Sequence, residues 1–294
     1  MAVANKVKGL SGDKALYLLD LATGTHRRLW QGRRAIEDVL ISPSAEYVAI
    51  RESETDDLHT PVLLYLRVLN NEGNSVLEVA DVYRFAWCPD GKFLAYITGR
   101  ARDGRFTPTG VWIYEVGKAP GSLILSDGAE VSWAEFDGML YILAYSPAGP
   151  VVYKYSPSDK RLSETNYHGI WFSRDGKYYY FTSNEGGPFR LYLRESNEDI
   201  TGNFEFLEKE MWPAIPRGWL DNSRLVFPAI RGANCDYVFD CDSGKLWRIR
   251  YKVIGAPRNE GELIVLDEKG KVAKVRGGSL KPITYDEIKD RLPR

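Results

Sequence analysis

Two charged segments of the chain carry residue types that suit the binding of a charged ligand. They are RESETDDLHTP (51–61), with Asp57 and His59, and GRARDGRFTPTG (99–110), with Arg100, Arg102 and Arg105. An arginine guanidinium can hold a carboxylate through two parallel hydrogen bonds, so the basic segment predicts an anion-binding site. The pair of segments would suit a charged peptide or a sugar acid. The alternative is that they pair with each other through exposed ion pairs, each worth about 0 to 1 kcal/mol.

Three further polar or aromatic residues are candidates for the same binding face. They are His168 in NYHG (166–169), Trp212 in EKEMWPAIP (208–216) and Arg231. Trp212 could be a stacking platform for a sugar or a peptide, although a tryptophan beside a proline also commonly fills a seam between packed sheets. The predicted binding set is therefore Arg100, Arg102, Arg105, Asp57, His59, His168, Trp212 and Arg231.

The sequence offers little for catalysis. It has three histidines, and a metal site built from His59, His168 and a carboxylate such as Asp57 would have few protein ligands, so we predict no metal and no cofactor. There is no G-x-S-x-G nucleophile motif and no G-x-x-x-x-G-K-[ST] phosphate-binding loop. The alternative to a binding protein is a lyase or hydrolase acting on a carbohydrate or cyclic ester, with His59 and His168 as acid and base.

Composition limits the partners. The 294 residues are 44% hydrophobic, enough for a large core, and 39 Lys and Arg oppose 40 Asp and Glu. A net charge of -1 gives no general attraction to nucleic acid or to an anionic membrane. The sequence shows neither a signal-peptide core nor an apolar run long enough for a membrane span, and its three cysteines have no CxxC spacing. We predict a cytoplasmic monomer that binds a protein, a peptide or a small polar ligand.

The stretch FAWCPDGKFLAYITG (85–99) shows how these segments are positioned. Pro89, Asp90 and Gly91 are typical of a tight turn between two strands. After the turn, Phe93 to Ile97 are apolar at every position, so both faces of this strand must be covered by neighbouring sheets.

The same pattern recurs along the chain. The equivalent turn residues are Ser44, Asp90, Asp137, Asp175 and Asn222, at steps of 46, 47, 38 and 47 residues. Steps of this size are typical of propeller blades, and a second kind of hairpin lies between the copies. We predict a six-bladed, all-β propeller of four-stranded antiparallel blades, in which strands a and b form the first hairpin and strands c and d the second. The N-terminal c and d strands would join the C-terminal a and b strands in one closing blade. Seven blades are the alternative, because ELIVLDEKGKVAKV (262–275) also fits a c/d hairpin.

The aromatic of strand a, the PDGK or RDGK turn and the FLAY that follows it resemble the WD-like repeats of TolB-type propellers, which also form the propeller of prolyl-oligopeptidase-like proteins. The resemblance covers nearly the whole chain and implies a propeller domain over residues 1–278. We expect no hydrolase domain of the kind that such enzymes carry, and residues 279–294 are predicted to carry a short helix capped by Thr284 and Glu287. Propellers host both binding proteins and enzymes. The sequence favours a non-catalytic binding scaffold.

Overall fold

The structure, a computed structural model, describes most of the chain. The described residues are 2–7, 14–19, 26–55, 61–102, 105–118, 120–182, 189–204, 216–228, 236–249, 252–255, 262–266 and 272–276. They form β-strands and one 3-10 helix, η1 (Thr201–Asn203), and none of their helices has the length and apolar character that a transmembrane span requires. The chain divides into two compact units, Met1–Trp133 with Gly138–Thr165, and Ala134–Asp137 with Asn166–Arg294. The predicted C-terminal helix lies outside the described residues.

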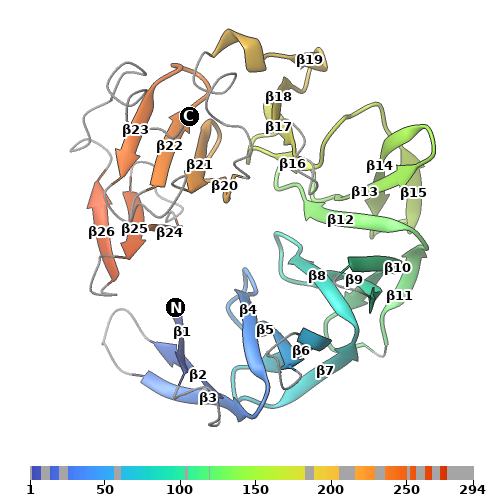
Figure 1. The fold of residues 1–294 in the computed structure, drawn as a ribbon, viewed down its shortest axis with the longest axis vertical. Helices are drawn as coiled ribbons and strands as arrows, with labels where there is room; N and C mark the ends of the chain where they lie inside the picture. Colours follow the sequence, from blue (N-terminus) through green and yellow to red (C-terminus); the bar gives the residue numbers. More distant parts are fainter. Residues whose placement is uncertain are drawn as a thin grey trace. The chain divides into compact units, whose positions relative to one another are not determined.

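The first unit contains four antiparallel sheets (Figure 1). Its three-stranded sheet is β1 (Ala2–Val7), β2 (Lys14–Leu19) and β3 (His26–Gly32). The next sheet is β4 (Ala35–Ile41), β5 (Tyr47–Thr55), β6 (Pro61–Asn70) and β7 (Ser75–Ala80). The third is β8 (Val82–Trp87), β9 (Phe93–Arg102), β10 (Arg105–Glu115) and β11 (Ser122–Leu125). The fourth is β12 (Gly128–Trp133), β13 (Leu140–Ser146), β14 (Gly149–Ser156) and β15 (Arg161–Glu164).

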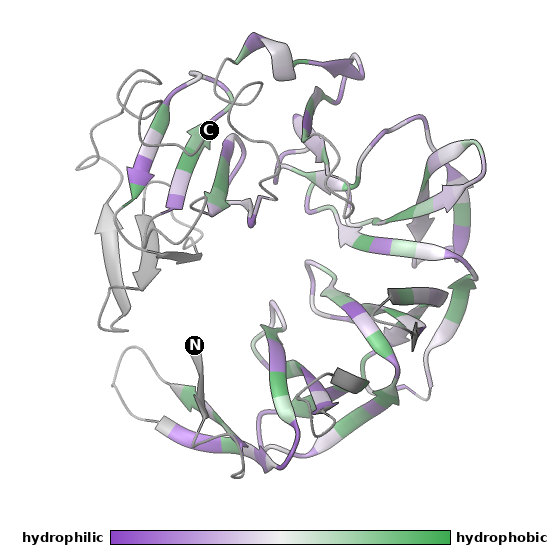
Figure 2. Cartoon of the chain, viewed as in Figure 1, coloured by the Kyte–Doolittle hydropathy of each residue, from purple (hydrophilic) through white to green (hydrophobic). Residues whose placement is uncertain are grey.

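The second unit contains three more antiparallel sheets. One is β16 (Trp171–Phe172), β17 (Tyr178–Phe181), β18 (Arg190–Leu193) and β19 (Glu198–Asp199). The next is β20 (Gly218–Trp219), β21 (Arg224–Pro228), β22 (Asp236–Asp240) and β23 (Leu246–Ile249), with apolar segments on β21 and β22 (Figure 2). The last is three-stranded, with β24 (Lys252–Gly255), β25 (Glu262–Leu266) and β26 (Val272–Arg276).

The structure corrects the predicted blade count. Among the described residues, five sheets have the four antiparallel strands of a blade, so this part of the chain has five blades and neither six nor seven. The predicted closing blade is absent from the described strands, because β2 pairs with β1 and β3, and β25 pairs with β24 and β26. Pairing with the next strand in sequence closes a short loop, which costs less chain entropy than joining the two ends of the chain. The strand over residues 2–7 was not predicted from the sequence.

The repeated turn has the conformation that its residues predict. In the turn between β8 and β9, the Asp90 carboxylate accepts a hydrogen bond from the Lys92 backbone N–H at 3.0 Å, and Gly91 has a φ of 75°. A φ in this range is unfavourable for residues that have a Cβ atom. The equivalent Asp175 accepts from the Lys177 N–H at 3.0 Å, and Gly176 has a φ of 71°. The stretch 85–99 is therefore one copy of a structural repeat.

The strand after this turn is covered on both faces, as its composition predicts. Leu94, Ala95, Tyr96 and Ile97 of β9 are all buried. Leu94 and Tyr96 pack in a cluster with residues of β6 and β8, whereas Ala95 and Ile97 pack with residues of β12 and β13. Alternate residues of β9 thus belong to two different interfaces between sheets, and this double coverage fixes where the ends of β8 to β10 lie.

Candidate functional site

The first strands of three successive blades in the first unit each begin with the same irregularity. The register of pairing shifts between Ile36 and Asp38 in β4, between Val82 and Arg84 in β8, and between Gly128 and Glu130 in β12. Each shift is a β-bulge, which inserts an extra residue and changes the direction of the side chains around it. The residue after each bulge is charged. Asp38, Arg84 and Glu130 therefore occupy equivalent positions, each three residues before the last residue of its strand.

The bulge of β8 holds an arginine between an aromatic stack and a buried carboxylate. The ring of Tyr83, the extra residue of the bulge, stacks on Phe106 with centroids 4.2 Å apart and an interplanar angle of 20°. The Arg84 guanidinium carbon lies 4.6 Å from the centroid of the Tyr83 ring. Arg84 Nε lies 3.2 Å from Oε2 and 3.4 Å from Oε1 of Glu130 on β12. Only 6% of Glu130 is exposed, so this carboxylate faces the interface between the two blades.

The far end of Arg84 has no such partner. Its side chain is 40% exposed, and within the described part of the chain its Nη1 and Nη2 atoms make no hydrogen bond or ion pair beyond the contacts of Nε. A guanidinium has five N–H donors, of which the two terminal amino groups carry four. The geometry therefore leaves the two-pronged end of Arg84 free to bind an anion.

A second arginine contacts the same bulge. Arg51 on β5 donates a hydrogen bond from Nη1 to the backbone carbonyl of Tyr83. Its Nε atom is buried and has no hydrogen-bond partner among the described residues. Two guanidinium groups thus meet around Tyr83, whereas Glu130 is the one carboxylate that pairs with Arg84 there in the described part of the chain. The local excess of positive charge favours an anionic ligand.

The predicted basic loop is an extension of the β9–β10 hairpin. The last residue of β9 that pairs with β8 is Thr98, and the first residue of β10 that pairs with β11 is Val111. Beyond these, β9 and β10 pair only with each other, up to Arg102 opposite Arg105. We call residues 99–102 and 105–108 the projecting ribbon. The expectation of a loop over 99–110 is wrong because the strands continue past the edges of their blade.

The three predicted arginines belong to the strands of the ribbon. In the backbone register, Arg102 and Arg105 are direct cross-strand partners, and Arg100 lies two residues before Arg102 on the same strand. Arg100 is exposed, and it makes no ion pair with any other described residue.

The base of the ribbon is joined to the Arg84 bulge. The Gly99 backbone N–H donates to the carbonyl of Asp81 at 2.9 Å, and Phe106 of the ribbon stacks on Tyr83. A Cβ atom at Gly99 would lie only 2.2 Å from Cζ of Phe106, so glycine is needed for this close approach. The ribbon and the Arg84 bulge therefore form one continuous structure.

The acidic segment pairs with other partners. Glu52, which is fully buried, accepts from Arg67 Nε at 2.9 Å, and Glu54 accepts from Arg34 Nε at 2.9 Å. Both carboxylates face arginines of their own blade or of the segment that precedes it. Burial raises the pKa of Glu52, although the ion pair with Arg67 acts in the opposite direction. One oxygen of Glu52, Oε1, is buried and has no hydrogen-bond partner among the residues that the structure describes.

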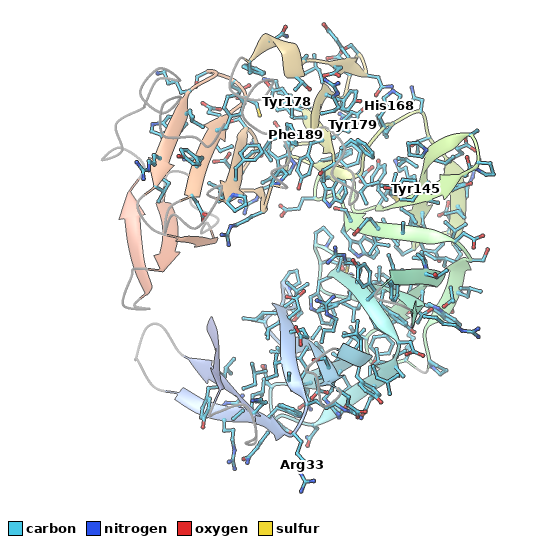
Figure 3. All side chains as sticks on the ribbon, viewed as in Figure 1. Arg33, Tyr145, His168, Tyr178, Tyr179 and Phe189 are labelled. Carbon is cyan, nitrogen blue, oxygen red and sulfur yellow. The ribbon has the colours of Figure 1, made fainter. Side chains whose placement is uncertain are left out.

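The other predicted site residues are scattered or lie outside the described residues. His168 is exposed in the second unit, and its ring centroid is 5.2 Å from that of Tyr192, which stacks on Tyr179 at 4.9 Å (Figure 3). Asp57, His59, Trp212 and Arg231 lie outside the described residues, as do the side chains of Arg102 and Arg105. Across the described part of the chain, no three His, Cys, Asp or Glu residues are grouped so as to hold a metal ion.

Sequence reasoning missed Arg84, Glu130 and Arg51. A signal was present, because Arg84 and Glu130 each precede a strand-a tryptophan by three residues, as His168 precedes Trp171. When an otherwise apolar strand has a charged or polar residue at the same place in successive repeats, that place is a candidate functional position. The bulge that turns this position into a site is set by pairing with the next strand, and one strand alone does not show it.

Comparison with known proteins identifies the fold. No family model and no curated protein matches the chain. Among solved structures, TolB from Acinetobacter baumannii is similar with a TM-score of 0.51 and 14% identity, over 80% of this chain and 59% of that one. The oligogalacturonate lyase from Vibrio parahaemolyticus also has a TM-score of 0.51, with 11% identity, over 72% of this chain and 68% of that one. The chain thus spans about three fifths of the TolB chain, and likenesses at these identities concern the fold alone.

Proposed function

We propose that this chain, a TolB-like β-propeller with five four-stranded blades, is a non-catalytic scaffold that binds an acidic peptide or protein, or a small polar ligand. The proposed surface in the first unit is the projecting ribbon with Arg100, Arg102 and Arg105. Asp57, His59, His168, Trp212 and Arg231 remain candidate binding residues of this proposal.

The observation that carries the proposal is that Arg100 is exposed and has no carboxylate partner among the described residues. This arginine lies on a strand that leaves its blade. The described carboxylates of the neighbouring acidic segment, Glu52 and Glu54, already pair with Arg67 and Arg34. Ion pairing with those two residues therefore does not account for the arginines of the ribbon, and a ligand carboxylate would suit them.

Catalysis has less support. The rival enzyme would need His168 as an acid or base, yet its ring packs against Tyr192, and no carboxylate among the described residues hydrogen-bonds to it. A general base is usually oriented by such a partner. We therefore favour binding.

A fluorescently labelled hexaglutamate peptide is the probe for this proposal. The triple variant Arg100→Ala, Arg102→Ala, Arg105→Ala should lose at least about tenfold in affinity, measured by fluorescence anisotropy, because hydrogen bonds between charged groups are lost. The control triple variant, Arg33→Ala, Arg161→Ala, Lys245→Ala, removes three exposed positive charges elsewhere and should bind as the wild type does. Figure 3 labels Arg33, whose side chain points outward. Equal loss in both triple variants would contradict a specific site on the ribbon.

The same assay addresses the histidines. His59→Ala and His168→Ala should each leave hexaglutamate binding within about twofold of wild type, because neither is proposed to form the main contact. Loss of binding in either variant, together with retention in the ribbon variant, would favour the rival site.

We also propose a monomer in the cytoplasm, with reduced thiols and without nucleic acid or membrane partners. The support is the net charge of -1 and the two described cysteines, Cys88 and Cys241, which are buried and form no disulfide. Light scattering on a size-exclusion column should give a mass near 33.3 kDa. A mass twice as large would contradict the monomer.

A further inference from the structure

We infer that Arg84 forms a carboxylate-binding subsite at the β8 bulge, in which Nη1 and Nη2 bind the two ligand oxygens and Glu130 and Tyr83 hold the guanidinium in place. This inference deepens the proposed function and rests on it in one respect, that the ligand is acidic. The residues differ from those of the ribbon, so the two sites can be tested separately.

The first support is preorganisation. An arginine side chain usually loses much rotamer freedom when it binds an anion. Arg84 is already held at two places, by its Nε contact with Glu130 at 3.2 Å and by its position 4.6 Å from the centroid of Tyr83. Tyr83 is in turn held by Phe106 on its ring and by Arg51 on its carbonyl. Much of the ordering cost of the guanidinium is therefore met before a ligand binds.

The second support is that a purely structural role accounts for the Nε atom of Arg84 but not for its two terminal amino groups. A contact between blades uses Nε and Glu130, and it leaves the terminal amino groups unpaired within the described part of the chain. Those two groups are the prongs that match the two oxygens of a carboxylate. The 40% exposure of the side chain gives a ligand access to this end.

The third support is the charge around the bulge. Arg51 and Arg84 contribute two positive charges, and Glu130 contributes one negative charge. A ligand carboxylate at the terminal amino groups of Arg84 would place a negative charge beside these two guanidinium groups. Arg51 strengthens the local positive potential, while its own Nη1 stays engaged with the Tyr83 carbonyl. We assign Arg84 as the residue that contacts the ligand and Glu130 as a positioning residue.

The test is an NMR titration of the full chain with succinate, followed by the backbone amides of Tyr83 and Phe85. Succinamide, the uncharged analogue, is the control probe. Succinate should shift both amides and succinamide should not. Arg84→Gln and Arg84→Lys should each weaken succinate binding at least about tenfold, because neither keeps the two-pronged guanidinium. Arg84→Lys keeps a cation for Glu130, so it should fold even where Arg84→Gln does not.

Glu130→Gln separates orientation from charge. Removing this carboxylate makes the site more positive, so a site that acted only through charge would bind succinate more tightly. If Glu130 orients Arg84, the variant should bind several-fold more weakly, while its melting temperature stays close to that of Arg84→Lys. Tighter binding in Glu130→Gln would overturn the positioning role, and unchanged binding in both Arg84 variants would overturn the subsite.

The two proposals fail in different ways. Should the Arg84 variants retain succinate binding while the ribbon variant loses hexaglutamate, the subsite is wrong and the proposed function stands. If the ribbon variant keeps hexaglutamate binding and Arg84→Lys loses succinate binding, the ribbon surface is wrong and the subsite stands. A control variant, Arg33→Ala, should match the wild type with both probes because Arg33 is exposed and has no described ion-pair partner.

Discussion

The indole N–H of Trp133, at the end of β12, donates a hydrogen bond to the backbone carbonyl of Ala86 on β8, at 3.0 Å. The same contact recurs one blade earlier, where Trp87 donates to Leu40 of β4 at 3.2 Å. In the second unit, Trp219 donates to Trp171 at 2.9 Å. In these three repeats the tryptophan of the first strand thus joins that strand to the first strand of the preceding blade. This contact gives a physical reason for the aromatic residue of the repeat.

The Trp133→Phe substitution should lower the free energy of unfolding of the first unit by about 1 kcal/mol. An aromatic ring remains, but the partly buried carbonyl of Ala86 loses this donor, and a lost hydrogen bond costs about that much. Urea unfolding measured by circular dichroism gives the difference. Trp30→Phe in the same unit is the matched control, because the Trp30 indole N–H makes no hydrogen bond to a described residue. A larger loss in the control than in Trp133→Phe would contradict this role.

The blades were predictable because each copy of the repeat contains its own local information. The Asp-Gly turn at 90–91 and the apolar run of β9 are consecutive in sequence. Together they specify a hairpin whose two faces must both be covered by neighbouring sheets. The ends of the chain were not predictable in this way. Whether β2 pairs with β1 or with a strand near residue 262 depends on competing long-range pairings, and the repeat does not extend to residues 2–7.

The candidate site was predictable in its residue types and less so in its geometry. The run of arginines at 100–105 was visible in the sequence, and the structure assigns Arg100 and Arg102 to β9 and Arg105 to β10. The ion pairs of Glu52 and Glu54 were not visible, because Arg67 and Arg34 come from distant segments that the fold brings together. Arg84 depends on a bulge and on a partner 46 residues away.

The Gly99→Ala substitution should destabilise the first unit by roughly 1 to 3 kcal/mol, the usual cost of overpacking. The new methyl group would lie 2.2 Å from Cζ of Phe106 and 2.5 Å from the carbonyl oxygen of Thr107, so the ribbon must shift. Because Phe106 stacks on Tyr83, the shift should also weaken succinate binding at Arg84. Urea unfolding and the succinate titration measure the two effects. Gly202→Ala, where a Cβ would meet no atom within 4 Å, should change stability by less than about 0.5 kcal/mol.

The thiols of Cys88 and Cys241 should react slowly in the folded protein. Cys88 is 2% exposed, and burial together with the hydrogen bond to Asp90 raises its pKa to about 11. Burial also raises the pKa of Cys241. The thiolate is the reactive form, so at about pH 8 alkylation should be at least about 100-fold slower than in urea. In a Cys235→Ser background, mass spectrometry after iodoacetamide treatment measures both rates. Fast labelling without urea would show that these turns open readily.

Glu52 should make stability depend on pH in a direction opposite to that of most carboxylates. Burial raises its pKa in the folded protein above the ordinary value of 4.5, despite the ion pair with Arg67. A raised pKa means that the folded state binds this proton more tightly than the unfolded state does. The contribution of Glu52 to stability is therefore fully present below about pH 4.5 and is lost as the pH rises through the raised value.

Glu52→Gln removes this ionisation and keeps the size of the side chain. The stability of the variant relative to the wild type should therefore rise between about pH 4 and about pH 8. Urea unfolding of both proteins at a series of pH values measures the difference. Glu54→Gln, which changes a half-exposed carboxylate of the same strand, is the control and should show a smaller change with pH. A relative stability that falls with rising pH would show that the Arg67 ion pair outweighs the burial of Glu52.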